Sequence, residues 1–149
     1  MKAHALMIVV AGLLIAADAK DDAKKELAKL QGVWQVTSME VDGQKAGEDE
    51  VKQVTVVIKD DQYSLKQQDN AVNQGTLILD TSKKPMAVDI KPKEGDNSGE
   101  VMKGIIEVKG DTQKVCWARP DKMRPTKFES EDGVTLVVLK KQAKTKEKK

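Results

Sequence analysis

Short apolar runs, rich in Val, Ile and Leu, alternate with polar turns along the chain from residue 32 onward. Runs of this kind, bounded by Gly, Asp, Asn and Pro, are typical of β-strands joined by tight turns. Asp42-Gly43 and Lys109-Gly110-Asp111 are two such turns. The pattern predicts about eight or nine short strands, including residues 32–41, 54–59, 63–68, 75–80, 86–91, 101–108, 113–118 and 134–140.

A short helix is predicted before the strands, over residues 23–30. Two acidic residues, Asp21 and Asp22, precede it, and Gly32 follows it. A helix dipole favours acidic side chains in the first turn, and glycine commonly ends a helix. Short strands at this spacing indicate an all-β antiparallel meander, closed as a barrel or folded as a sandwich.

Residues 1–19 have the features of a secretory signal peptide. Lys2 and His4 form a short basic start, residues 5–17 are apolar, and Ala17 and Ala19 supply the small residues that a signal peptidase reads. The apolar run is shorter than the roughly 20 residues of a bilayer span, so an uncleaved anchor is the weaker alternative. We expect cleavage after Ala19, export to the periplasm or medium, and no stable membrane span.

The length of the remaining chain fits a single domain over residues 20–139. The last ten positions, 140–149, hold six Lys and one Glu and predict a disordered tail. The formal net charge of the whole chain is only +2, so no strongly basic face for nucleic acid is expected. The tail is interpreted as a solubility device or, alternatively, as a contact for an anionic envelope polymer.

Candidate catalytic chemistry is sparse. The single His of the chain is His4, in the leader, so an exported chain lacks the imidazole that Ser-His and Cys-His catalysis require. The single Cys, Cys116, has apolar neighbours, which favours a buried thiol over a reactive one and allows no internal disulfide. We therefore expect no enzyme activity and no cofactor.

An acidic loop over residues 94–100 resembles the first positions of a calcium-binding loop. The bidentate Glu of such a loop would fall on Ile105, so the full ligand set is missing. A polar loop is favoured over a loose calcium site, and no metal site is expected.

A series of short motifs runs in order from about residue 27 to residue 140. The motifs are Leu30-Gln31-Gly32-Val33-Trp34, Lys84-Pro85-Met86-Ala87-Val88-Asp89, Gly110-Asp111-Thr112, Val115-Cys116-Trp117 and Arg124-Pro125-Thr126-Lys127-Phe128. The series resembles a family of uncharacterised exported domains that is abundant in planctomycete bacteria, although Ile106 stands where that family usually has a tyrosine. The family has no assigned activity, so the resemblance implies a fold and export but no function.

Gly32-Val33-Trp34 also resembles the Gly-x-Trp signature of lipocalin-type barrels. This resemblance implies a lipocalin-like barrel with Trp34 at its closed end, covered by a basic side chain from near the last strand. Arg124 and Lys140 are the candidates for that partner. A cation over an indole contributes about 0.5–2 kcal/mol while its stem covers apolar surface.

Two functional hypotheses remain open, and a monomer is expected under both. In the first, the barrel encloses a cavity of some hundreds of Å³ for a small apolar ligand. Its pocket residues would be Trp117, Tyr63, Ile105 and Leu77. In the second, the barrel is filled by its own side chains and acts as an envelope interaction module. Short strands and many small side chains favour the filled barrel. The side chains expected to point inward are Val36, Val56, Ile58, Leu77, Leu79, Ile105, Val115, Trp117, Leu136 and Val138.

Overall fold

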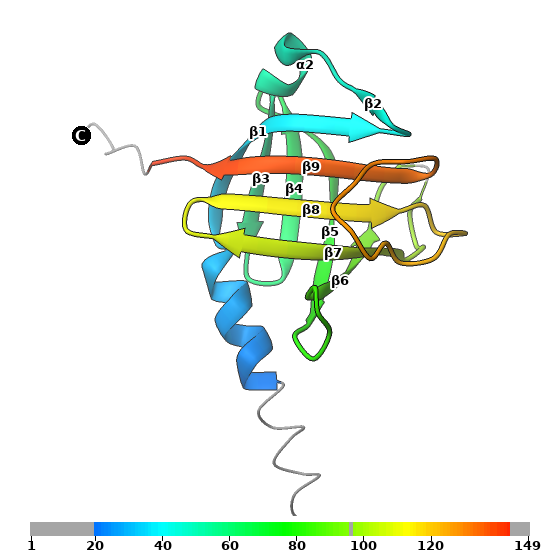
Figure 1. Ribbon diagram of the computed structural model, residues 1–149. Helices are drawn as coiled ribbons and strands as arrows, with labels where there is room; N and C mark the ends of the chain where they lie inside the picture. Colours follow the sequence, from blue (N-terminus) through cyan, green and yellow to red (C-terminus); the bar gives the residue numbers. More distant parts are fainter. Residues whose placement is uncertain (1–19, 96, 144–149) are drawn as a thin grey trace, which may run out of the picture.

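In the computed structural model, which describes residues 20–95 and 97–143, the strands form a single antiparallel sheet of nine strands (Figure 1). A helix over residues 20–29 precedes the sheet. The elements that follow are β1 (Gly32–Val41), β2 (Gln44–Lys45), α2 (Glu48–Lys52), β3 (Val54–Lys59), β4 (Gln62–Gln67), β5 (Asn70–Asp80), β6 (Ala87–Pro92), β7 (Met102–Lys109), β8 (Thr112–Ala118) and β9 (Val134–Lys141).

Pairing between the first and last long strands closes the sheet into a barrel. β1 pairs with β3 along residues 32–35 and with β9 from Trp34↔Lys141 to Val41↔Thr135, with a bulge between Val36 and Ser38. β2 adds only two residues to the end of β1, so eight strands form the closed barrel. The predicted all-β antiparallel meander barrel with a short N-terminal helix is confirmed, and the sandwich alternative is wrong.

Several element boundaries differ from the sequence prediction, and two of the differences change the description of the barrel. β5 begins at Asn70, five positions before the predicted start at residue 75. The prediction began later because the first residues of the strand are polar and carry no apolar pattern. β9 continues through Lys141, so Lys140 and Lys141 belong to the barrel ladder and not to a disordered tail. The sequence prediction therefore places the start of the disordered tail too early, at residue 140. Residues 144–149 and the predicted signal peptide, residues 1–19, lie outside the described residues.

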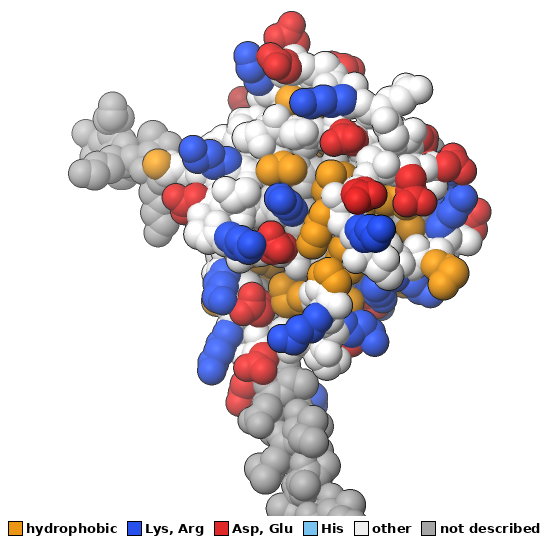
Figure 2. All heavy atoms as spheres, in the orientation of Figure 1, with side chains coloured by type: hydrophobic (Ala, Val, Ile, Leu, Met, Phe, Trp, Pro, Cys, Tyr) orange, Lys and Arg blue, Asp and Glu red, His pale blue; other side chains and the backbone are white. Residues whose placement is uncertain are grey.

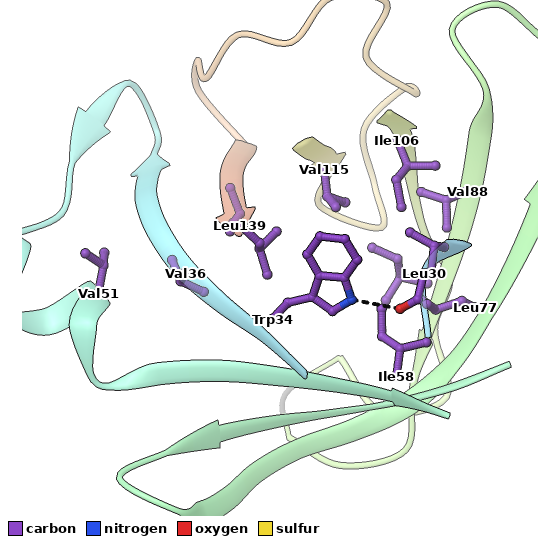
Figure 3. Packing of buried hydrophobic residues seen from close by; sticks show 12 residues of the cluster. Leu30, Trp34, Val36, Val51, Ile58, Leu77, Val88, Ile106, Val115 and Leu139 are labelled. Carbon is purple, nitrogen blue, oxygen red and sulfur yellow. Dashed lines mark hydrogen bonds between the residues drawn. The ribbon is translucent and has the colours of Figure 1, made fainter. Parts of the chain in front are cut away.

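One end of the barrel is closed by a buried tryptophan (Figure 3). Trp34 is 0% exposed, and its indole N–H donates a hydrogen bond of 2.7 Å to the carbonyl oxygen of Leu30, which is also 0% exposed. Val36, Leu139 and Val115 are among the buried side chains around the ring. Because the only polar atom of the indole is paired, the largest side chain of the core is buried without an unmet hydrogen bond.

The N-terminal helix is tied to the same end of the barrel through Gln31. Its Nε2 donates to the carbonyl oxygens of Leu27, at 3.0 Å, and of Asp60, at 2.9 Å. In return, the backbone N–H of Asp60 donates to Gln31 Oε1 at 2.7 Å. Asp60 lies in the β3–β4 turn with a φ of 58°. The side chain therefore joins the end of the helix to a turn 29 residues further along the chain.

A second, smaller core lies on the outer side of the barrel wall. It is built by apolar side chains of β7, β8 and β9 together with the segment that joins β8 to β9: Ile105, Cys116, Ala118, Val134, Leu136 and Phe128. Cys116 alternates along β8 with Val115 and Trp117, which face the barrel interior. The connecting segment, residues 119–133, thus covers part of the outer wall (Figure 1).

The face seen in Figure 2 carries Lys and Arg side chains interspersed with Asp and Glu, so neither sign of charge dominates it. Hydrophobic side chains gather where the β8–β9 segment lies on the sheet, to the right of that view. Among the described residues, no helix is both long enough and apolar enough to cross a membrane.

Candidate ligand-binding cavity

The barrel interior contains a cavity of about 180 Å³. All the long strands contribute to its wall, and almost all the lining side chains are apolar. They are Val36, Met39, Val56, Ile58, Tyr63, Leu65, Asn73, Leu77, Val88, Ile90, Met102, Ile106, Gln113, Val115, Trp117, Val137 and Leu139. Of the described residues that line the cavity, none is charged. This volume is smaller than the several hundred Å³ expected of a carrier, but the interior is not completely filled.

The lining divides into a buried part and a half-buried part. Residues near the Trp34 end, such as Leu77 and Leu139, are buried. Residues nearer the other end, such as Met39, Met102 and Trp117, are half-buried. The cavity is therefore deep on the Trp34 side and partly open on the side of Trp117.

A polar chain lies at the half-buried side. The Tyr63 hydroxyl donates to Asn73 Oδ1 at 3.0 Å, and Asn73 Nδ2 donates to the carbonyl oxygen of Glu94 at 3.3 Å. Burial raises the pKa of Tyr63 from 10.0 to about 12, because the charged phenolate is poorly solvated there. Tyr63 is therefore neutral at physiological pH, and its oxygen retains the capacity to accept a hydrogen bond.

Gly75 makes room for the Tyr63 ring. A Cβ at this position of β5 would lie 2.7 Å from Tyr63 Cε1 and 2.8 Å from its hydroxyl oxygen, and it would also overlap the carbonyl oxygen of Lys91. Real Cβ atoms essentially never approach other atoms that closely. Because Gly75 has no side chain, the aromatic ring of Tyr63 is able to lie against β5 in the cavity wall.

Gln113 is the one polar side chain that is fully buried among the described residues. It is 3% exposed and lines the cavity, and its Nε2 has no hydrogen-bond partner within the described part of the chain. In β8 it is in phase with Val115 and Trp117, so the alternation of the strand turns all three inward. A buried amide without a partner is costly, and native proteins retain few of them.

The structure brings together three of the four predicted pocket residues. Tyr63, Leu77 and Trp117 all line the cavity. Ile105 does not, because it faces the outer core with Cys116, and its neighbour Ile106 faces inward instead. On the outer face of β7, Ile105 alternates with Lys103, Glu107 and Lys109, so the polar positions indicate that Ile105 points outward and its assignment to the pocket is wrong. Ile105 is buried there because the segment 119–133 covers it.

The same phase error affects the last strand of the expected inward set. Val137 and Leu139 line the cavity, whereas Leu136 packs in the outer core. Val138 is half-buried and pairs with Ser38 and Lys114 in the ladders. The remaining members that line the cavity as expected are Val36, Val56, Ile58, Leu77, Val115 and Trp117.

The cation over Trp34 is Lys141 and not Arg124 or Lys140. Lys141 Nζ lies 5.6 Å from the centroid of the Trp34 ring. Lys140 is exposed on the opposite face of β9, because neighbouring residues of a strand point to opposite sides. The resemblance to the lipocalin signature indicated a basic partner near the last strand, but its position could be read only from the strand phase.

Arg124 instead holds the β8–β9 segment against the barrel wall. Its Nη1 donates to the carbonyl oxygens of Val88, at 3.1 Å, and Gly104, at 2.8 Å, and its Nη2 donates to Asp89 Oδ1 at 2.8 Å. Val88 and Gly104 are directly opposed in the β6–β7 ladder. Arg124 therefore bridges two strands from the outside.

Cys116 is buried in the outer core, under the segment that Arg124 holds. It is 0% exposed, and its thiol donates to the carbonyl oxygen of Glu129 at 3.4 Å. Burial is the main cause of the raised pKa of this thiol. A neutral, covered thiol of this kind is a poor nucleophile.

Sequence reasoning missed two polar residues of the cavity, Gln113 and Asn73. Gln113 could have been found, because it occupies an inward position two residues before Val115 in an otherwise apolar strand phase. Asn73 lies in the part of β5 that the sequence did not assign to a strand. Its inward direction follows only from the pairing with Leu65.

Across residues 20–95 and 97–143, no group of three or more His, Cys, Asp or Glu side chains is placed to hold a metal ion. Searches of the chain against models of protein families, curated proteins and solved structures found no match. The cavity is therefore the feature of the molecule that points to a function.

Proposed function

We propose that this protein is an exported binding protein whose barrel takes up a small, mainly apolar molecule. The observation that carries the proposal is the partly open cavity of about 180 Å³, lined by apolar side chains and by no charged one among the described residues. An apolar cavity of about 150 Å³ is known to bind benzene, so this volume suits a molecule of roughly six to ten non-hydrogen atoms.

The export part of the proposal is supported by the composition of residues 1–19 alone. The apolar stretch and the small residues at 17 and 19 are those of a secretory signal peptide. An exported carrier with so small a cavity would hold a molecule of low mass, and not a long-chain lipid.

The first experiment is native mass spectrometry of the chain purified gently from its own host. An additional small mass that is lost on denaturation is the expected result, and its identification would name the ligand. A bare polypeptide mass, together with no thermal shift across a panel of small apolar compounds, would contradict the proposal. The alternative, an interaction module of the cell envelope, would then direct the search to surface partners.

A pair of matched variants tests whether binding occurs inside the barrel. Val115→Phe places a ring in the cavity, whereas Val33→Phe adds the same ring on the outer face of β1, where Val33 is 37% exposed. Val115→Phe is expected to abolish uptake and Val33→Phe to retain it. Circular dichroism and thermal unfolding of both variants establish that each is folded, so that a loss of binding is assigned to the cavity.

A further inference from the structure

The interior amide of Gln113 has a position that packing alone does not explain. Gln113 pairs with Leu139 in the β8–β9 ladder, next to the pair Thr112↔Lys140. Gln113 also lies opposite Val108 of β7. Its neighbours in the two adjoining strands are therefore apolar. An apolar residue at this position would continue the pattern set by Val115.

The amide is the natural partner of a polar group on a bound molecule. Gln113 Nε2 is a hydrogen-bond donor that finds no acceptor within the described residues, although the side chain lines a cavity. The other polar groups of the lining, on Tyr63 and Asn73, are already bonded to each other at the half-buried side. Within residues 20–95 and 97–143, Gln113 is thus the one side chain on the buried part of the wall with an unpaired polar atom.

The surroundings also restrict the charge of the bound molecule. None of the described residues that line the cavity is charged, so an ionised carboxylate, phosphate or amine would lose its hydration without a compensating ion pair. A carbonyl or hydroxyl oxygen loses much less and is able to accept the N–H of an amide.

We propose that Gln113 is a specificity-determining residue, an inference that rests on the proposed function. The ligand is an uncharged, mainly hydrocarbon molecule whose single carbonyl or hydroxyl oxygen accepts a hydrogen bond from Gln113 Nε2. Ketones, alcohols and esters of small size belong to this class. Hydrocarbons lack the acceptor, and carboxylic acids are ionised at neutral pH.

The test compares three compounds of similar size, namely ethylbenzene, acetophenone and benzoate, by titration calorimetry at neutral pH. The informative quantity is the ratio of the dissociation constants of acetophenone and ethylbenzene, measured for the wild type and for Gln113→Leu. Comparing ratios cancels the different hydration of the two compounds. Replacing the amide is expected to shift this ratio about tenfold or more toward ethylbenzene, since the partner of a buried hydrogen bond is lost.

Two controls accompany the variant. Gln74→Leu makes the same substitution at an exposed position of β5 and is expected to leave the ratio unchanged. Gln113→Met retains a long unbranched side chain without hydrogen-bonding groups and is measured beside the leucine variant. If Gln113→Leu does not fold, the methionine variant gives the same comparison.

The outcomes separate the two proposals. Binding of ethylbenzene and acetophenone with an unchanged ratio in Gln113→Leu overturns the role of Gln113 and leaves the binding function in place. Benzoate binding as tightly as acetophenone overturns the uncharged class. If none of the three probes binds the wild type and no compound of the panel shifts its thermal unfolding, the binding function is overturned and this inference with it.

Discussion

Lys141 Nζ lies 5.6 Å from the centroid of the Trp34 ring, at the point where the last strand of the barrel passes the first. The stem of the lysine also passes close to Gly32, where an added Cβ would lie 3.3 Å from Lys141 Cε. Gly32 has a φ of +116°, in a region that favours glycine. The start of β1 and the end of β9 are therefore joined by one side chain over the closed end.

Removing this side chain should weaken the closed end. Lys141→Ala is expected to lower the free energy of unfolding by about 1–2 kcal/mol, since both the cation over the indole and the apolar cover of the stem are lost. Lys141→Met retains the cover and should lose about half as much. Urea denaturation followed by tryptophan fluorescence measures both.

Lys140→Ala is the matched control. Lys140 lies next to Lys141 but is exposed on the other face of β9, so its replacement should change the free energy of unfolding by less than about 0.5 kcal/mol. An equal loss for the two lysines would show that charge near the end of the chain matters and that the contact with Trp34 does not.

Arg124 should control access to Cys116. Arg124→Met loses the bonds to Val88, Gly104 and Asp89 and is expected to lower the free energy of unfolding by about 2–3 kcal/mol. Because the segment 119–133 then opens more often, Cys116 should react with a thiol reagent faster than in the wild type. The rate of modification under native conditions measures this opening.

Arg119→Met serves as the comparison for Arg124→Met. Arg119 and Asp132 form an exposed pair at 3.7 Å, which contributes little to stability. Its loss should leave the modification rate of Cys116 almost unchanged. A fast reaction of the wild type, equal to that of a denatured sample, would contradict the covered outer core.

Tyr63 should give the protein a specific sensitivity to alkali. Its pKa is raised from 10.0 to about 12 on folding, so the folded state binds the proton more tightly than the unfolded state. The resulting contribution to stability is complete below pH 10 and is lost as the pH rises from 10 toward 12. Stability should therefore decrease over this range more steeply in the wild type than in Tyr63→Phe.

The comparison with Tyr63→Phe is needed because Cys116 acts in the same direction. Burial raises the pKa of that thiol over its ordinary value, and both proteins contain it. Since Tyr63 is the only tyrosine of the chain, the absorbance of tyrosinate reports its ionisation directly. A midpoint near 10 in the folded protein would contradict the buried environment of the ring.

The sequence was sufficient for the antiparallel meander, but not for the choice between barrel and sandwich, because turns and strand composition are local signals. Asp42-Gly43 and Gly110 mark hairpins through the positive φ angles that their backbones adopt, 53° and 81° for the first pair and 58° for Gly110. The predicted limits of β1 and β3 agree with those of the structure. Closure by β1 and β9 is not local, but it is the usual way to remove two open edges.

The direction of side chains in β9 could not be predicted in the same way. A strand exposed on one side alternates between apolar and polar residues, and that alternation gives its phase. Leu136, Val137 and Val138 are consecutive apolar residues, since Val137 lines the cavity while Leu136 packs in the outer core. In β7 the alternation is present, because Lys103, Glu107 and Lys109 share the phase of Ile105 and indicate that it points outward. No local signal indicates that the segment 119–133 covers Ile105 there.

Gln113 offers a last test, in which stability and binding should respond in opposite directions. Gln113→Leu removes a buried amide without a partner and replaces it with a side chain of similar size. The free energy of unfolding should rise by about 1–3 kcal/mol, while the exposed control Gln74→Leu changes it by less than about 0.5 kcal/mol. Residues kept for binding often reduce stability in this way. A clear loss of stability in Gln113→Leu, measured by urea denaturation, would instead show that the amide is satisfied inside the barrel and serves the fold.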